Sequence, residues 1–249
     1  DTNEKTLVLS VKNSDIRKIK NSNNKKRKKD EYKNLKNNSK YVIEVQNISK
    51  YYISGKNKVS KILDGLDLKI EKGDFVVLFG KSGSGKSTLL NIISGNIECD
   101  EGKITLNGED VSFKDEYKRS KNIGRVFQNT SLGVAPNMSI LENLALADNK
   151  GKRFGLASGI NKKRIPYYEK ILKELDLGLE DKLYNKVNLL SGGQRQALSM
   201  LMAVMSNPKL LLLDEHTAAL DPKTSLKIME ITEKIVKERS LTTIMITDR

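Results

Sequence analysis

Nine consecutive residues in the first half of the chain are rich in glycine, serine and lysine, and they contain the spacing GxxxxGK followed by serine. They stand between an apolar run at 75–79 and a helical pattern at 89–94, which gives the order strand, glycine loop, helix. Glycines let a backbone approach a ligand closely, and the N–H groups at a helix N-terminus attract anions. We predict that Lys86 reaches the β- and γ-phosphates of a nucleotide and that Ser87 places its hydroxyl on Mg²⁺. The predicted loop comprises Gly80, Lys81, Ser82, Gly83, Ser84, Gly85, Lys86, Ser87 and Thr88.

A second chemical pattern is an apolar run, 210–213, that ends in two acids, Asp214 and Glu215. Ligands of parallel sheets bind at the carboxyl ends of the strands, so we predict that Asp214 faces the Mg²⁺ shell. Glu215 points elsewhere and is the candidate general base that polarises the attacking water. An acidic strand end that merely caps the next helix is the alternative, and the phosphate loop in the same chain favours the site.

A third pattern, Leu190-Ser191-Gly192-Gly193-Gln194, precedes an apolar helical stretch at 197–205. Ser-Gly-Gly before a helix predicts another nest of backbone N–H groups, and hence a second anion site. The spacing does not decide whether the two anion sites meet within one chain or between two chains.

The elements that position these residues begin near Tyr41. Strands are predicted at 41–45, 66–70 and 243–246, and the continuous apolar run at 75–79 predicts a strand buried on both faces. From 136 to 196 the pattern is mostly helical, with a capping box that starts at Ser139 and apolar residues at helical spacing in 168–175. Strand–loop–helix units of this kind predict an α/β fold.

Charge and composition limit the function classes. The 249 residues include 45 Lys and Arg against 31 Asp and Glu, a formal net charge of +14, and residues 1–40 alone hold 13 basic residues, 5 acidic residues and eight Asn. We therefore predict that 1–40 is a basic, disordered tail or linker. Its run at 25–29 is a candidate for RNA or an anionic membrane surface, but a solvated linker is favoured.

Single Cys and His residues, Cys99 and His216, exclude an intramolecular disulfide, a Cys-based zinc cluster and a site built on several His. No apolar run approaches the ~18 residues that a membrane helix needs.

Together the motifs resemble the nucleotide-binding subunit of an ABC (ATP-binding cassette) transporter over about 41–249. Besides the loop at 80–88 and LSGGQ at 190–194, the resemblance rests on Arg125-Val126-Phe127-Gln128-Asn129, the strand ending at Asp214-Glu215, and Ala218-Ala219-Leu220-Asp221. It implies a P-loop NTPase core with a mainly parallel sheet, an antiparallel β subdomain and an α-helical subdomain at about 130–196. It also implies an ATPase whose cofactors are ATP and Mg²⁺.

The resemblance assigns roles to further residues. Gln128 matches the residue that senses Mg²⁺ and faces the permease, which makes it both a catalytic and a metal-site candidate. Ser191 and Gly193, within the signature that includes Gly192 and Gln194, match residues that touch the γ-phosphate held by the other subunit. Asp221 matches the residue that signals across the dimer. Tyr52 fits the aromatic platform for adenine, with Tyr51 as the alternative, and Arg125 has no expected role beyond packing at a strand end.

The partners implied are a second ABC subunit, an integral-membrane permease on another chain and a periplasmic or lipoprotein substrate-binding protein. The expected location is the cytoplasmic face of the cell membrane. The sequence Asp214-Glu215-His216-Thr217 resembles that of bacterial ABC ATPases of an amino-acid-uptake type, so an importer is expected. A soluble ABC protein acting on ribosomes or nucleic acid is the alternative, although a nucleic-acid partner is not expected because this chain carries one cassette.

Two positions depart from the family pattern. His216 stands where most members have Pro, and Asp248 stands where the family has the switch His that holds the γ-phosphate. Asp is an acceptor and an anion, so it cannot replace that donor. With the end at Arg249, this predicts a truncated or degraded cassette, and a hydrolysis-poor nucleotide-binding fragment is a further alternative.

Overall fold

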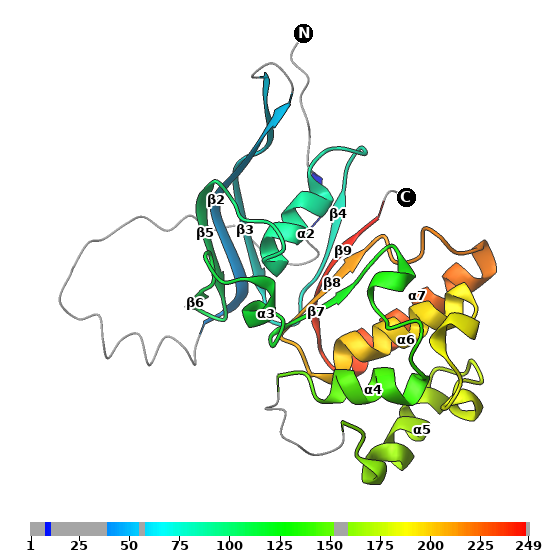
Figure 1. The fold of residues 1–249 in the computed structure, drawn as a ribbon. Coiled ribbons are helices and arrows are strands. Elements are labelled where there is room, and N and C mark those ends of the chain that lie inside the picture. The colour runs from blue at the N-terminus through cyan, green and yellow to red at the C-terminus, as the bar shows by residue number, and fades with distance from the viewer. Residues whose placement is uncertain (1–7, 11–38, 55–57, 152–158, 248–249) are drawn as a thin grey trace, which may run out of the picture. The chain divides into compact units, whose positions relative to one another are not determined.

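The computed structural model describes residues 8–10, 39–54, 58–151 and 159–247. The chain divides into two compact units, one formed by residues 1–119 and 246–249 and the other by 120–245. Strands and helices of both units are labelled in Figure 1. The fold is α/β, with antiparallel and parallel strand pairs and helices, as predicted.

The first unit contains a four-stranded sheet in the order β3-β2-β5-β6, and each of its neighbouring strands pairs antiparallel. This sheet is the predicted antiparallel β subdomain. Apolar side chains on β2 and β3, among them Val45, Ile48 and Ile70, are fully buried. The elements of the unit are β1 (Val8–Ser10), β2 (Tyr41–Ser54), β3 (Lys58–Glu71), β4 (Phe75–Phe79), α2 (Lys86–Ser94), β5 (Glu101–Leu106), β6 (Glu109–Asp110) and α3 (Glu116–Arg119).

Strand β4 leads into the predicted phosphate loop, but it is not buried on both faces as its apolar run suggested. Val76 and Leu78 are buried, whereas Phe75 and Phe79 keep 38% and 36% of their surface exposed. The pleat of a strand sends alternate side chains to opposite faces, and only one of these faces is closed off. The strand itself is confirmed.

Within the predicted tail, three residues differ from the expectation. Val8–Ser10 form β1, which pairs antiparallel with Val77–Phe79 of β4. They belong to the apolar run Leu7-Val8-Leu9 that interrupts the polar composition of the tail. Residues 1–7 and 11–38 of the tail lie outside the described residues, so the prediction stands there as a prediction.

The second unit holds a parallel strand pair and the helical region. Strand β8 lies between β9 and β7, and β7 pairs parallel with β8. Helix α6 packs against β7, α4 and α7. The elements are β7 (Ile123–Val126), α4 (Ile140–Asp148), α5 (Ile165–Lys173), α6 (Gly192–Met205), β8 (Leu210–Asp214), α7 (Pro222–Glu238), β9 (Thr242–Ile246), and the short 3₁₀ helices Thr130–Leu132, Lys162–Arg164, Glu180–Lys182 and Val187–Leu189.

Helix starts in this unit follow their sequence signals. Ser139 caps α4 in a capping box with Glu142, as predicted, and Asp221 followed by Pro222 starts α7. The four leucines of β8 are each 0% exposed, so this strand is buried on both faces. The buried strand β8 therefore places Asp214 at its carboxyl end, and Glu215 follows directly.

Candidate functional site

The predicted phosphate loop, residues 80–88, connects β4 to α2, as the strand–loop–helix pattern predicted. Gly83 and Gly85 both have positive φ, 77° and 95°, which disfavours any residue with a side chain. A Cβ at Gly85 would also lie 2.9 Å from Leu63 Cδ2 and 3.1 Å from the Ile62 carbonyl oxygen, whereas one at Gly83 would meet nothing within 4 Å. At Gly85 both the positive φ and the lack of space for a Cβ require glycine. At Gly83 only the positive φ does, because a Cβ there would have free space around it.

Lys86 is the first residue of α2, and its side chain folds across the loop. Only 5% of the residue is exposed, and Nζ donates to the carbonyl oxygens of Gly80 at 2.6 Å and Lys81 at 3.3 Å. A buried ammonium is stable only with partners of this kind. The backbone of the loop therefore binds the positively charged ammonium group of Lys86.

Two further observations test whether a phosphate group fits this loop. The hydroxyl of Ser84 is buried and makes no hydrogen bond to the described residues. The N-cap of α2 is Gly85, so no side chain caps its first turn, which contains Ser87 and Thr88. An oxyanion supplies acceptors for both the hydroxyl and the helix N-terminus, so the residues present fit a phosphate.

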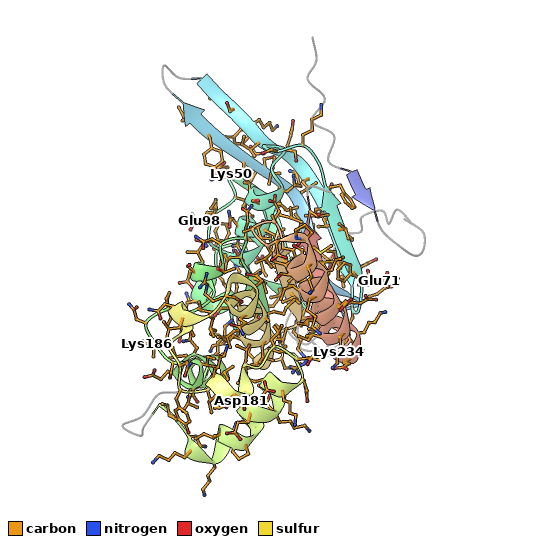
Figure 2. All side chains as sticks on the ribbon, turned by 90° about the vertical axis from the view of Figure 1, so that its right-hand side faces the viewer. Lys50, Glu71, Glu98, Asp181, Lys186 and Lys234 are labelled. Atoms are coloured by element: carbon orange, nitrogen blue, oxygen red, sulfur yellow. The ribbon has the colours of Figure 1, made fainter. Side chains whose placement is uncertain are left out.

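The aromatic candidates lie on β2 of the same unit. Tyr52 is 42% exposed, and Nζ of Lys50, which is labelled in Figure 2, lies 5.6 Å from its ring centroid. Tyr51 instead has Lys61 Nζ at 5.3 Å from its ring, and its backbone N–H donates to Asp100 Oδ2 at 2.6 Å. This bond lowers the pKa of Asp100. The more exposed ring is that of Tyr52, the first choice from the sequence.

The carboxylate pair belongs to the second unit, where β7 and β8 end side by side. Arg125 of β7 reaches Asp214 of β8, with Nη2 to Oδ2 at 3.1 Å. The two side chains are only 9% and 14% exposed, and the guanidinium carbon of Arg125 lies 4.6 Å from the centroid of the Phe127 ring. Arg125 therefore has an electrostatic partner that the sequence-based assignment to strand-end packing missed.

Gln128 and Glu215 form the second contact between these strand ends. The amide nitrogen of Gln128 donates to Glu215 Oε2 at 3.0 Å. With its nitrogen directed at Glu215, the amide presents its oxygen as the atom that can coordinate a cation. Glu215 itself has φ 43°, a left-handed conformation that non-glycine residues adopt at a cost and that often marks functional sites.

His216 follows Glu215 and turns into the protein interior. It is 3% exposed, and Nε2 lies 3.1 Å from the hydroxyl oxygen of Thr232 on α7. That hydroxyl donates its hydrogen to the Ile228 carbonyl oxygen at 2.8 Å, so it accepts from His216, which carries its proton on Nε2. Burial lowers the pKa of His216 to about 4. The imidazole therefore fastens the residue after Glu215 to helix α7.

The signature residues form the N-terminus of α6. Ser191 Oγ accepts from the Gln194 N–H at 3.2 Å, and Gln194 Oε1 accepts from the Ser191 N–H at 3.2 Å, which completes a capping box. Gln194 also donates to the Leu177 carbonyl oxygen at 3.1 Å. The spacing Ser-x-x-Gln carried this signal in the sequence, where we interpreted the residues only as an anion nest.

The glycines of the signature lie against the segment that leads into α7. A Cβ at Gly193 would lie 2.3 Å from Thr224 Cγ2, and one at Gly192 would lie 3.3 Å from Leu220 Cδ2. Asp221 caps α7 by accepting from the Thr224 N–H at 3.0 Å, and the hydroxyl and N–H of Thr224 hold the pKa of Asp221 below its usual value. Gly193 and Asp221 thus both contact Thr224.

The predicted residues fall into two sets. Tyr52 and the loop at 80–88 belong to the first unit, and Gln128, the signature, the carboxylates and Asp221 belong to the second. Within the second unit the structure brings Gln128 to Glu215, and it adds Arg125 beside Asp214. Asp248 and Arg249 lie outside the described residues, so the prediction about the switch position remains one.

No three Asp, Glu, His or Cys residues in the described ranges are grouped as a metal site. Mg²⁺ commonly binds proteins through one or two carboxylates together with substrate phosphates, so a single strand-end carboxylate with hard oxygen ligands fits that ion. Among the helices that the structure describes, none has the length and apolar character needed to cross a membrane.

Comparisons with known proteins agree with these motifs. Residues 63–218 match the family model described as ABC transporter. A tyrosine transport ATP-binding protein of Clostridioides difficile (strain R20291) is 47% identical over 206 residues, which cover 83% of this chain and 82% of that protein. A putative hemin import ATP-binding protein of Staphylococcus aureus (strain bovine RF122 / ET3-1) is 35% identical over 206 residues, covering 82% and 88%. A solved dimeric ATP-binding cassette in a post-hydrolysis state, with bound ADP and Pi, has a TM-score of 0.71 and 32% identity, covering 83% of this chain and 88% of that chain.

Proposed function

The chain belongs to the ABC transporter family, and on that premise we propose which residues bind and hydrolyse ATP and what the transporter carries. As a family member it is an ATP-binding subunit with ATPase activity that serves a transporter. The names of its relatives support this function over a soluble ABC protein acting on ribosomes or nucleic acid.

The phosphate loop provides the binding half of the reaction. Lys86 is already held inside the loop by two carbonyl oxygens, and it exchanges them for the β- and γ-phosphate oxygens of ATP. The uncapped first turn of α2 and the Ser84 hydroxyl donate to the same phosphates. Ser87 and Asp214 hold Mg²⁺, which neutralises charge on the phosphates, and Tyr52 stacks on the adenine.

The carboxylate end of β8 provides the hydrolytic half. Glu215 accepts a proton from the attacking water, and Gln128 orients Glu215 through the 3.0 Å hydrogen bond. The single observation that carries this assignment is that bond, because it joins the two catalytic candidates, which follow the ends of β7 and β8. The bond from His216 to Thr232 fastens the turn that follows Glu215.

The partners that we propose are those that the family resemblance implies. Ser191 and Gly193 contact the γ-phosphate held by a second copy, so two chains enclose two ATP molecules, and Asp221 lies beside the signature through Thr224. A permease on another chain and a substrate-binding protein complete the importer. The chain is then peripheral on the inner face of the cell membrane.

For the transported substrate we propose an amino acid of the tyrosine type. Support comes from the 47% identity to a protein named for tyrosine transport, against 35% to one named for hemin import. The sequence Asp214-Glu215-His216-Thr217, with His216 in place of Pro, also supports an amino acid as the substrate, because it resembles ABC ATPases of an amino-acid-uptake type.

Hydrolysis is tested with Glu215→Gln and a matched control, Glu230→Gln, which removes an exposed carboxylate from α7. Loss of a general base costs about 10²–10⁴ in rate, so Glu215→Gln should lose Mg²⁺-ATP turnover while it keeps its affinity for ATP. The control should keep both. Turnover of Glu215→Gln within threefold of the control would overturn the role of Glu215.

The substrate is tested separately in cells from which the gene that encodes this chain has been deleted. Complementation with the parent or with Glu230→Gln should restore uptake of radiolabelled tyrosine, and Glu215→Gln should not. Uptake that never depends on the chain, in cells where the purified chain hydrolyses ATP, would overturn the substrate and leave the ATPase assignment standing.

A further inference from the structure

Arg125 places a fixed positive charge on the carboxylate that the proposed function assigns to Mg²⁺. Its Nη2 lies 3.1 Å from Asp214 Oδ2, and both side chains are at least 86% shielded from solvent. Charges this shielded are weakly screened by water and salt, so each strongly affects what the other can bind.

Strand register explains why the arginine reaches this carboxylate. In the parallel pair, Arg125 of β7 stands opposite Leu212 of β8, two residues before Asp214. Two residues of strand span about 6.6 Å, which an extended arginine side chain covers. Phe127, two residues further along the chain from Arg125, points to the same side and places its ring 4.6 Å from the guanidinium carbon. The guanidinium is thus held by a ring on one side and a carboxylate on the other.

A carboxylate in this position has two competing cations. Breaking a buried ion pair leaves an uncompensated charge and is costly, so the pair persists in the metal-free protein. A divalent cation that approaches Asp214 meets a positive charge already within hydrogen-bonding distance of the same oxygen. Repulsion between the two opposes binding of the bare metal ion.

We propose that Arg125 is a positioning residue. In the metal-free chain its ion pair balances the negative charge of Asp214, and this lowers the affinity of Asp214 for a divalent cation that arrives without nucleotide. The inference rests on the proposed function, because it takes Asp214 as the metal carboxylate. Phosphate groups bring the negative charge that offsets Arg125, so the chain accepts Mg²⁺ together with ATP and not before it. Arg125 sets this order of loading, and the reacting atoms do not touch it.

The test measures binding of Mn²⁺, a paramagnetic substitute for Mg²⁺, to the full chain without nucleotide. Unbound Mn²⁺ is counted by electron paramagnetic resonance. Arg125→Met removes the charge, Arg125→Gln removes it but keeps an amide donor, and Arg125→Lys keeps it. Removing a shielded positive charge from beside Asp214 removes its repulsion of the metal ion, so we expect Arg125→Met and Arg125→Gln to bind Mn²⁺ about tenfold or more tightly than the parent. Arg125→Lys should stay within threefold of the parent.

Two controls separate this effect from a change in stability. Arg164→Met removes another arginine–aspartate pair of the same unit, with Asp148 at 2.7 Å, and should leave Mn²⁺ affinity unchanged. Adding Asp214→Asn to Arg125→Met should abolish the gain. Circular dichroism verifies the fold of each variant, so that a gain in a folded variant is assigned to the lost charge.

The outcome is read against ATP binding in the same samples. An increase of less than threefold in both charge-removing variants, in chains that bind Mg²⁺-ATP, overturns the role of Arg125 and leaves the proposed function intact. A gain that persists with Asp214→Asn also overturns it, because the metal then binds elsewhere. A parent chain that binds no ATP overturns the proposed function itself.

Discussion

Lowering the pH should destabilise the chain through one identifiable group, His216. The imidazole is 3% exposed, and burial lowers its pKa from 6.5 to about 4. As pH falls below 6.5, the unfolded chain binds a proton at this histidine while the folded chain does not until about pH 4. Stability contributed by the neutral, buried His216 is therefore complete above pH 6.5 and is lost progressively as the pH falls towards 4.

The size of the effect follows from the difference in pKa. A shift of about 2.5 units corresponds to about 3 kcal/mol once the pH is below 4, and about 2 kcal/mol of it is lost between pH 7 and pH 5. His216→Gln removes the titrating group but keeps an N–H donor for Thr232. Urea unfolding at the two pH values should show that the parent loses about 2 kcal/mol more than this variant.

The chain has one histidine, so its ring signals in an NMR titration belong to His216 alone. A folded-state pKa near 4 is expected, together with a hydrogen-bonded Nε2–H. A measured pKa above 6, or equal pH dependence of stability in the parent and in His216→Gln, would refute the reasoning from burial.

Two further predictions concern the nucleotide loop and the signature. Lys86→Ala should weaken ATP binding about ten- to a hundredfold in calorimetry, which is the value of one charge-assisted contact. The control Lys234→Ala, which changes an exposed lysine on α7 labelled in Figure 2, should leave the affinity unchanged. Equal affinities of the two variants would show that Lys86 does not hold phosphate. Gly193→Ala should lower the thermal midpoint by the equivalent of about 1–3 kcal/mol because its Cβ would lie 2.3 Å from Thr224 Cγ2, whereas Gly192→Ala should cost less. Adding Thr224→Ser, which removes that methyl group, should recover most of the loss, and no recovery would exclude the clash as its cause.

Local motifs carried much of the sequence-based prediction. The loop at 80–88 could be placed because strand, glycines and helix are contiguous, and the end of β8 could be placed because four leucines precede two acids. The capping box at Ser139 was also recognised from contiguous residues. The same kind of signal at Ser191 and Gln194 was present but was interpreted only as an anion nest.

Contacts between distant segments could not be predicted in the same way. Arg125 and Asp214 are 89 residues apart, and their meeting depends on which strands pair and in which register. The bond from His216 to Thr232 likewise depends on how α7 packs against the turn after β8. An isolated arginine or histidine in the sequence carries no mark of such a partner.

Parallel pairing of β7 with β8 also affects how the chain folds. Residues 127–209, including α4, α5 and α6, separate the two strands, so their pairing closes a loop of more than eighty residues. Closing such a loop must precede the contacts that repay its entropy, which makes high-contact-order topologies slow to fold. The pairs Arg125–Asp214 and Gln128–Glu215 can form only after this closure. On a translating ribosome, Asp214 and Glu215 therefore acquire their partners only after β8 has been synthesised, long after the predicted phosphate loop has emerged.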